Sequence, residues 1–289
     1  MILPPFAYLR PHSLGGALSL LSDVDGAAVL AGGQTLLNVL KLDLAAPAAL
    51  VDIHRLAELR AIEVRPDGTL TIGAAVTYAE LASNPVVSEH QPSVSAMAAG
   101  LVDRQVRNRG TIGGNCCLND PTNNFPPLLM ALDANFHLIS TSGTRVLPAE
   151  AFFTGTLNTA LAADEILAAV EIPALPETAH VVHQHMQVGA DSWAIARSVV
   201  RLDIDNGEVT AARAIAGAVV NSPMRLPMVE ATLVGSRADK ELAGNAAAAF
   251  DRSDVQTVDD VHCSARYRHR ISKIQLLRAV TAAVEGSAP

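Results

Sequence analysis

In the first third of the chain, short hydrophobic runs alternate with glycine, proline and small polar residues. A helical pattern that includes Leu18 and Leu21 begins after Ser13, a residue type that caps helix N-termini well. The runs that follow predict a buried strand at 27–30, a helix at 36–42 and a second strand at 49–53. This order of elements predicts a small α+β unit at the N-terminus.

The middle third continues the alternation and has its own turn and cap signals. Alternating runs at 62–64 and 69–72 flank Pro66-Asp67-Gly68, a sequence typical of a tight turn between two strands. Thr77 with Glu80 three residues later forms a capping-box pattern and predicts a helix through Leu81. Further along, the pattern predicts a helix at 92–101 and strands at 136–140, 144–147 and 166–172.

Two prolines, Pro173 and Pro176, interrupt the pattern and predict a domain boundary near Leu175. Strand-like runs at 180–188, 194–203 and 209–219, with a turn at 205–207, predict a three-stranded antiparallel sheet. Runs at 227–233, 240–250 and 264–284 predict helices that pack on this sheet. The expected domains are therefore 1–175, with two subdomains at about 1–55 and 56–175, and 176–289.

Between Arg107 and Leu132 lies the densest group of candidate functional residues. A basic run at 104–109 leads into the sequence Thr111-Ile112-Gly113-Gly114-Asn115. Glycine lets backbone N–H groups approach an anion closely, and it supplies the positive φ values that turn successive N–H groups toward one point. A helix predicted at 124–134, with two prolines near its first turn, would add a positive dipole end. These features predict a phosphate-binding loop.

A second glycine pair repeats this design near the N-terminus. Gly32 and Gly33 follow the strand at 27–30, and Gln34 and Thr35 precede the helix at 36–42. Two such loops, each between a strand and a helix, suit a ligand that carries two phosphate groups. Neither loop has the G-x-G-x-x-G spacing of a Rossmann dinucleotide-binding protein, which argues against an NAD enzyme of that fold.

Composition and charge narrow the class of protein. With 289 residues, of which 49% are hydrophobic, the chain can bury a substantial core in two or three lobes. Its formal net charge of −8 argues against nucleic-acid binding, which needs a basic face. The N-terminus lacks a secretory signal pattern and no apolar run approaches membrane-spanning length, so we expect a cytoplasmic protein.

Cysteine and histidine spacing does not predict a metal site. Cys116 and Cys117 are adjacent and Cys263 is distant, which matches no zinc or iron–sulfur spacing and predicts small packed thiols. In the strand at 180–188, His180 alternates to the face opposite the other two histidines. We therefore expect no metal ligands on this chain.

Three segments together carry a family resemblance. The stretches AGGQTLLNVLKLDLAAPAALVDI (31–53), TIGAAVTYAEL (71–81) and RNRGTIGGNCCLNDPTNNFP (107–126) resemble the FAD-binding medium subunit of molybdenum hydroxylases. This family includes carbon monoxide dehydrogenase, xanthine dehydrogenase, and bacterial N-heterocycle and aldehyde dehydrogenases. The resemblance covers nearly the whole chain. It implies an α+β fold: a two-subdomain FAD-binding domain of the PCMH type, like that of vanillyl-alcohol oxidase, followed by a small C-terminal domain.

The resemblance also implies a set of FAD-binding residues, and it implies no catalytic acid or base on this chain. Asn124 stands where the family usually has an Asp that accepts hydrogen bonds from the adenosine part of FAD. Trp193 matches an aromatic position beside the flavin ring, and Leu167 a position whose backbone lies near it. Relatives often carry a Lys around His183 to His185, where this chain has none, and His185 is the candidate for a flavin-side role. The expected FAD-binding residues are Ala31, Gly32, Gly33, Gln34, Thr35, Leu36, Thr111, Ile112, Gly113, Gly114, Asn115, Asp120, Asn124, Leu167, His185 and Trp193.

Several of these residues also have a structural alternative. Asp120 suits a turn before Pro121, and Trp193 suits a core or subunit-interface position. Side chains of the polar residues in the glycine segments can cap the helices that follow instead of binding phosphate; they are Gln34, Thr35, Thr111 and Asn115.

The family resemblance implies that this chain carries FAD within a heterotrimer. Electrons from hydroxylation at a molybdenum cofactor on a large subunit would pass through two [2Fe–2S] clusters on a small subunit to this FAD, and then to an external acceptor. A dimer of heterotrimers is the expected assembly. Two alternatives stay open: a structural subunit that has lost FAD, suggested by Asn124 and the missing Lys, and a free-standing FAD oxidoreductase.

Overall fold

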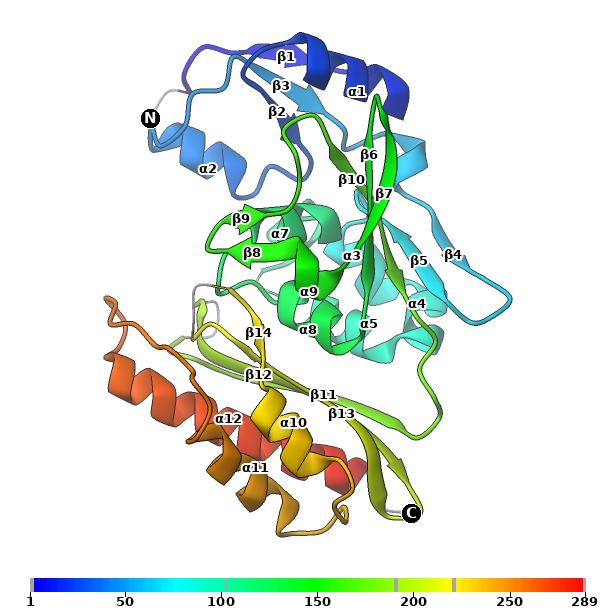
Figure 1. Cartoon of the computed structure of the whole chain (residues 1–289). Coiled ribbons are helices and arrows are strands. Elements are labelled where there is room, and N and C mark those ends of the chain that lie inside the picture. Colours follow the sequence, from blue (N-terminus) through cyan, green and yellow to red (C-terminus); the bar gives the residue numbers. More distant parts are fainter. Residues whose placement is uncertain (1–2, 102, 190–191, 220–221, 288–289) are drawn as a thin grey trace. The chain divides into compact units, whose positions relative to one another are not determined.

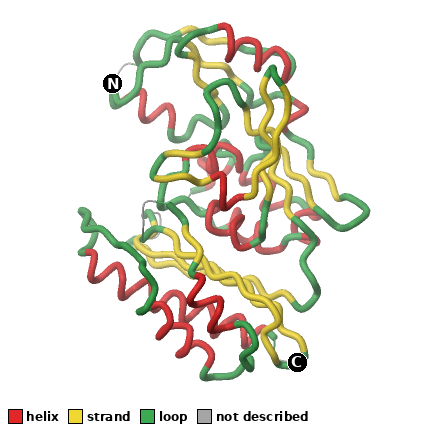
Figure 2. The backbone as a smooth tube through the Cα atoms, viewed as in Figure 1, coloured by secondary structure: helices red, strands yellow, loops and turns green. Residues whose placement is uncertain are grey.

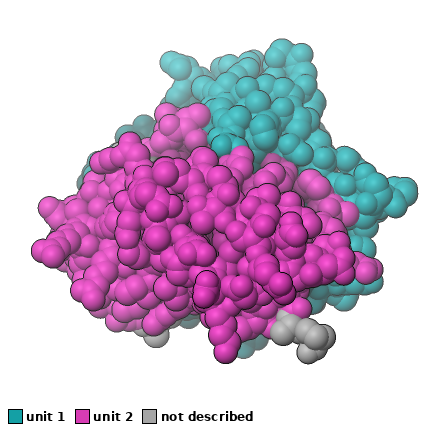
Figure 3. All heavy atoms as spheres, turned by 60° about the horizontal axis from the view of Figure 1, so that its bottom comes forward, with its two compact units in different colours: residues 1–118, 135–152, 159–172 teal, residues 119–134, 153–158, 173–289 magenta. Residues whose placement is uncertain are grey.

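The computed structural model describes residues 3–101, 103–189, 192–219 and 222–287, whose contacts form two compact units (Figure 3). Unit 1 comprises residues 1–118, 135–152 and 159–172, and unit 2 comprises residues 119–134, 153–158 and 173–289. Both units contain helices and strands, which confirms the predicted α+β class. Within the described ranges, no helix is long and apolar enough to cross a membrane.

A three-stranded parallel sheet begins unit 1. Strands β1 (Ala7–Leu9), β2 (Ala27–Leu30) and β3 (Ala49–Asp52) lie in the order β1-β3-β2 (Figure 1). Strand β1 was absent from the prediction, because its residues Ala-Tyr-Leu do not alternate between apolar and polar as Ile-Glu-Val at 62–64 does. Helix α1 (Leu14–Asp23) packs on β2 and β3, and helix α2 (Leu36–Lys41) follows β2. The carboxyl end of β2 therefore leads directly into the first glycine pair.

The predicted cap of α1 is confirmed. The Ser13 side chain accepts a hydrogen bond from the Gly16 N–H at 3.1 Å, which satisfies one of the free donors in the first turn of the helix. The start of α1 is therefore fixed by a signal that is visible in the local sequence.

An antiparallel sheet of five strands forms the rest of the unit 1 framework. It has the order β4-β5-β10-β6-β7, built from β4 (Ile62–Val64), β5 (Leu70–Gly73), β6 (Asn135–Ser140), β7 (Gly143–Pro148) and β10 (Ile166–Ile172). All five strands were predicted to within one residue at each end. The predicted Pro-Asp-Gly turn joins β4 to β5, with Gly68 at a φ of +82° that favours glycine.

Short helices surround this sheet. They are α3 (Tyr78–Ser83), α4 (Pro85–His90), α5 (Pro92–Ala99), α6 (Arg104–Arg107), α7 (Ile112–Leu118) and α9 (Ala149–Phe152), with a 3-10 turn at Ala57–Leu59. The capping box of α3 is confirmed: the Thr77 side chain accepts from the Glu80 N–H, and the Glu80 carboxylate accepts from the Thr77 N–H. An ion pair from Arg60 also holds Glu80. The start of α3 is thus fixed by polar contacts on two sides.

Unit 2 is built on a second antiparallel sheet, whose strands are yellow in Figure 2. The strand order is β11-β12-β13-β14. Its strands are β11 (Ala179–Gln187), β12 (Ala194–Asp205), β13 (Glu208–Gly217) and the short β14 (Met224–Arg225), so the three predicted strands gain a fourth. Asn206 and Gly207 both have positive φ in the predicted hairpin turn between β12 and β13. A separate two-stranded pair joins β8 (Phe153–Gly155) to β9 (Asn158–Thr159).

Helices cover both faces of the unit 2 sheet. Helices α10 (Pro227–Leu233), α11 (Leu242–Phe250) and α12 (Ala265–Gly286) lie on one face (Figure 1). Side chains of the sheet such as Val200 and Leu202 share a core with Leu276 of α12. Helix α8 (Phe125–Ala131) lies against β12 and β13. Just after α8, Asp133 accepts hydrogen bonds from Arg201 and Arg213, whose side chains alternate to the face opposite the core.

Replacing Thr77 by Ala should destabilise unit 1, because the change removes the side-chain acceptor that caps α3. We expect the free energy of unfolding to fall by about 1–2 kcal/mol. The matched variant Thr77→Ser keeps the hydroxyl and should stay close to wild type. Urea unfolding followed by circular dichroism measures both variants, and equal stability of Thr77→Ala and Thr77→Ser would show that the cap contributes little.

Candidate cofactor site

The first glycine segment, residues 31–35, leaves consecutive backbone N–H groups without an acceptor. In the described part of the chain, the N–H groups of Gly32, Gly33, Gln34 and Thr35 donate no hydrogen bond. Gly33 has a φ of +71°, the left-handed conformation that turns neighbouring N–H groups toward one side. Such a row of backbone donors between a strand and a helix is typical of an anion-binding concavity.

Gly32 is where the two glycine segments touch. It is buried, and a Cβ built on it would lie 2.1 Å from the carbonyl oxygen of Arg109 and 2.9 Å from the Cα of Gly110. Only a residue without a side chain allows this approach of two backbones. The contact brings residues 31–35 next to the start of the second glycine segment.

The second glycine segment corrects one prediction. Gly113 and Gly114 lie in the first turns of helix α7 rather than in a loop, and neither has positive φ. The element before them is the four-residue helix α6, which ends at Arg107, and not the expected strand. A Cβ on Gly113 would come within 2.5 Å of the Ala74 Cβ, so this glycine serves close packing between α7 and the chain after β5.

Hydrogen bonds within the protein also occupy the backbone donors at the start of α7. Ile112 N–H donates to the Val76 carbonyl at 3.1 Å, and Gly113 N–H to the Ala74 carbonyl at 2.9 Å. Gly114 N–H donates to Thr111 Oγ1 at 3.1 Å. The predicted cradle of N–H groups is therefore open at residues 32–35, whereas at α7 these donors hold the helix in place.

Gly114 nevertheless belongs to the surface that the first segment presents. It is exposed, and a Cβ built on it would lie 2.9 Å from Thr111 Oγ1 and 3.9 Å from the Cβ of Ala31. Asn115, the next residue, is half-buried, and its side chain is hydrogen-bonded to the Tyr78 hydroxyl. On the side of the first segment, the atom nearest to a Cβ on Gly114 is therefore the methyl carbon of Ala31, and the carboxamide of Asn115 follows in the chain.

The arginines before the second glycine segment have different roles. Arg107 Nη1 donates to the Leu101 carbonyl at 2.8 Å, so this side chain supports the local loop. Arg109 is exposed, and with burial and Arg60 it lowers the pKa of His54. His54 follows β3 at the carboxyl edge of the parallel sheet, where its main chain accepts from Arg60. The predicted strand at 49–53 places His54 just after a strand, but the local sequence does not predict that Arg60 and Arg109 lie near it.

Leu167 is buried at an irregularity of β10. The pairing of β10 with β6 shifts between Leu167 and Ala169, and the carbonyl of the intervening Ala168 accepts from the Ala74 N–H at 2.9 Å. Since the Ala74 carbonyl accepts from Gly113, the backbone next to Leu167 connects to helix α7 through one residue. Leu36, the remaining predicted residue of the first segment, begins α2.

The other predicted residues lie in unit 2. Asp120 Oδ1 accepts from the N–H and the hydroxyl of Thr122, at 2.8 and 2.5 Å, which is the turn-forming alternative. Asn124 precedes α8, and its Oδ1 accepts a hydrogen bond from Arg197 on β12. Trp193 immediately precedes β12 and is 57% exposed. This exposure argues against a core position for Trp193. A large exposed aromatic side chain suits contact with a ligand or partner.

His183 and His185 share a face of the unit 2 sheet with Arg197. In the β11–β12 register His185 pairs with Arg197, and the two imidazole rings stack with centroids 6.2 Å apart. His180 pairs with Leu202 instead, so the predicted alternation of the histidines is confirmed. The described residues contain no group of three His, Cys, Asp or Glu side chains that could hold a metal ion.

Burial controls the charge on this face of the sheet. It lowers the pKa of Arg197 to about 10, although the guanidinium is still protonated at neutral pH. Burial, Arg197 and His185 lower the pKa of His183 to about 4. The same two causes, burial first and Arg197 second, lower the pKa of His185. At neutral pH both imidazoles are therefore uncharged beside a cation.

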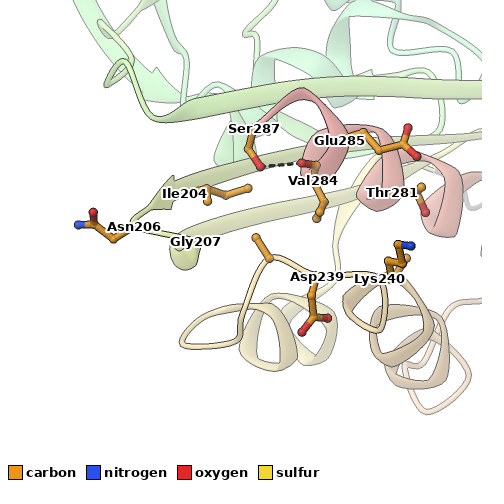
Figure 4. Close-up of a pocket in the computed structure, with 11 residues that line it drawn as sticks. Ile204, Asn206, Gly207, Asp239, Lys240, Thr281, Val284, Glu285 and Ser287 are labelled. Atoms are coloured by element: carbon orange, nitrogen blue, oxygen red, sulfur yellow. Dashed lines mark hydrogen bonds between the residues drawn. The ribbon is translucent and has the colours of Figure 1, made fainter. Parts of the chain in front are cut away.

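A separate cavity of about 720 Å³ lies in unit 2 at the β12–β13 hairpin tip, between the start of α11 and the end of α12 (Figure 4). Its walls include Ile204, Gly207, Lys240, Thr281 and Glu285. No residue expected from the sequence to bind FAD lines it. This cavity is therefore distinct from the glycine segments.

Comparison with known proteins identifies the family. A family model described as the FAD binding domain in molybdopterin dehydrogenase matches residues 4–175, more than half of the chain. The chain belongs to this family. A second model, the CO dehydrogenase flavoprotein C-terminal domain, matches residues 182–283.

Relatives agree with this identification over the full length of the chain. The carbon monoxide dehydrogenase medium chain of Hydrogenophaga pseudoflava is 34% identical over 285 residues, which are 98% of each protein. The nicotine 6-hydroxylase medium subunit of Paenarthrobacter nicotinovorans is 32% identical and covers 98% of this chain and 99% of its own. These relatives confirm the predicted class, the FAD-binding medium subunit of a molybdenum hydroxylase-type dehydrogenase.

Solved structures confirm the fold of this FAD-binding medium subunit. A chain of the Hydrogenophaga pseudoflava carbon monoxide dehydrogenase matches with a TM-score of 0.96 and covers 100% of both chains at 34% identity. A chain of quinoline 2-oxidoreductase from Pseudomonas putida 86 matches with a TM-score of 0.94 at 31% identity, covering 99% of each chain. The predicted arrangement of a FAD-binding domain followed by a small C-terminal domain is thereby confirmed.

The lowered pKa of His183 predicts how stability depends on pH. Between pH 6.5, the ordinary value, and about pH 4, the unfolded chain binds a proton at this position that the folded chain does not. The free energy of unfolding should therefore fall as pH drops through this range. In His183→Gln this dependence should flatten, as measured by urea unfolding at pH 4.5, 5.5, 6.5 and 8.

The measurement at pH 8 is the control, since His183 is neutral there in both states, and it reports the packing change alone. Parallel pH curves for wild type and His183→Gln would contradict a buried, neutral imidazole.

Proposed function

We propose that this FAD-binding medium subunit carries FAD as the electron-transfer subunit of a heterotrimeric molybdenum hydroxylase. Its partners would be a large subunit with the molybdenum cofactor and a small subunit with two [2Fe–2S] clusters, paired as a dimer of heterotrimers in the cytoplasm. The bound FAD would accept electrons from the clusters and pass them to an external acceptor. The observation that carries the proposal is the row of free N–H groups at residues 32–35.

The free N–H groups at residues 32–35 suit the diphosphate of FAD. The diphosphate of a dinucleotide is an anion, and consecutive backbone N–H groups bind phosphate oxygens without any side-chain charge. In the part of the chain that the structure describes, the donors of Gly32, Gly33, Gln34 and Thr35 are available for this purpose. Asn115 would add a side-chain hydrogen bond and Gly114 would keep the approach open, whereas Thr111 is buried and its Oγ1 accepts from the Gly114 N–H in the first turn of α7.

The remaining predicted residues have narrower proposed roles. Backbone at Leu167 would lie near the flavin, Trp193 would stack on or shield it, and His185 would lie on the flavin side. Asp120 and Asn124 would contact the adenosine part, with Asn124 also bonded to Arg197. We assign no general acid or base to this chain, because its residues would hold and orient the cofactor while other subunits bind the hydroxylated substrate.

The proposal is tested by flavin analysis of the complex and of the chain alone. We expect about one FAD per chain on acid release, a flavin absorption band that bleaches when the substrate of the complex is added, and recovery of the band on adding an acceptor. An intact, active complex without flavin would instead support the structural subunit. Turnover of a small substrate by the chain alone would support a free-standing FAD oxidoreductase.

A Gly114→Val substitution should weaken flavin binding strongly while most folding contacts stay intact, with a local shift of Thr111, whose Oγ1 would lie 2.9 Å from the new Cβ. Gly114 is exposed at the start of α7, so the added side chain would extend over the surface next to Ala31. We expect flavin occupancy to fall by about tenfold or more, because the phosphates could no longer approach the backbone. Occupancy is the number of flavins per chain, measured from the ratio of flavin absorbance to protein absorbance and compared with about one in wild type.

Gly15→Val is the matched control. Gly15 is also exposed in the first turn of a helix in unit 1, and a Cβ built on it would meet no atom within 4 Å, so flavin occupancy should be unchanged. Full occupancy in Gly114→Val would rule out the surface at Gly114 as the phosphate approach.

A further inference from the structure

Tyr78 is not among the residues expected from the sequence to bind FAD. Its ring contacts the second glycine segment. It is the first residue of α3 and is 7% exposed. A Cβ on Gly110 would lie 2.5 Å from Cε2 of this ring, so Gly110 allows the ring to pack directly on the backbone. The ring therefore forms part of the support under the chain that enters α7.

Backbone hydrogen bonds join the same two segments. Tyr78 N–H donates to the Gly110 carbonyl at 3.0 Å, and Ile112 N–H donates to the Val76 carbonyl at 3.1 Å. Between these bonds, Thr77 and Thr111 form an isolated antiparallel bridge. Since the capping box and Arg60 fix the start of α3, the position of Tyr78 is set by the fold of unit 1 itself.

The hydroxyl of Tyr78 then reaches the side chain of Asn115, with which it is hydrogen-bonded. Burial raises the pKa of Tyr78, so the phenol stays protonated and uncharged at neutral pH. Asn115 is half-buried and directly follows the exposed Gly114. A carboxamide has a donor end and an acceptor end, and a fixed partner on one end determines which atoms the other end presents.

We propose that Tyr78 is a positioning residue for flavin binding, which holds the carboxamide of Asn115 in the orientation that FAD requires. Tyr78 does not touch the cofactor in this scheme, and it acts by removing the rotational freedom of Asn115 before the ligand arrives. Binding to a preorganised side chain loses less conformational entropy. This inference rests on the proposed FAD-binding function of the chain.

The test compares FAD binding by two flavin-free full-length proteins, the wild type and Tyr78→Phe. This substitution keeps the ring and removes only the hydroxyl. Quenching of flavin fluorescence gives the dissociation constant for FAD. We expect it to rise by about tenfold in Tyr78→Phe, because Asn115 loses a buried hydrogen-bond partner. Thermal unfolding of the flavin-free chain should change little, since the ring still packs on Gly110.

Asn115→Ala and the double variant separate positioning from a general structural role. If Tyr78 acts through Asn115, Tyr78→Phe should weaken FAD binding in wild type and have no further effect in Asn115→Ala. A structural role of Tyr78 would instead give effects that add. Tyr267→Phe, an exposed tyrosine on α12, is the matched control and should bind FAD as wild type does.

The outcomes distinguish this inference from the proposed function. Wild-type chain that binds no FAD would overturn the proposed function. Wild-type chain that binds FAD, together with a Tyr78→Phe variant of equal affinity or with additive effects in the double variant, would overturn the positioning role alone.

Discussion

The contact of Gly32 with the main chain at Arg109 and Gly110 is the constraint on which the candidate site depends. Two backbones can pass this closely only where no Cβ intervenes, and the approach places residues 31–35 beside the start of α7. With no side chain between the two segments, the N–H groups after β2 stay open to a ligand. The site is thus defined by the absence of side chains, while the residues around it provide rigidity.

That rigidity comes from the chain that follows β5. Ala74, Val76 and Tyr78 each hold the second glycine segment by a backbone hydrogen bond, and the Ala168 carbonyl ties Ala74 to the antiparallel sheet. Backbone hydrogen bonds inside a packed interior hold their geometry well, because breaking one would leave a buried polar group unsatisfied. A short helix with two glycines in its first turns can therefore persist, although its own sequence gives it little helical preference.

Elements with local sequence signals were predicted well, and contacts between distant residues were not. The Thr77 capping box and the turn at Gly207 depend only on neighbours within a few residues, and the glycine segments themselves are visible in the sequence. Helix α7 was expected as a loop, but tertiary hydrogen bonds such as that of Gly113 override the preference of the glycine pair. Tyr78 lies 37 positions from Asn115, and no periodicity or turn pattern links the two. Contacts between residues this far apart produce no pattern in the local sequence.

The amide at position 124 affects the charge balance of the unit 2 sheet. An aspartate there, as the family resemblance implies, would neutralise Arg197, whereas Asn124 gives the guanidinium a hydrogen-bond acceptor without a negative charge. A second positive charge close to a buried guanidinium is unfavourable, and this explains why Arg197 contributes to lowering the pKa of both His183 and His185. Without a carboxylate at position 124, the charge of Arg197 is not neutralised there. The fold tolerates this charge because the neighbouring imidazoles of His183 and His185 stay neutral and add no further positive charge. On the face opposite the core, Arg197 is thus held next to a neutral amide and two uncharged rings, whereas Arg201 and Arg213 on the same face are paired with the Asp133 carboxylate.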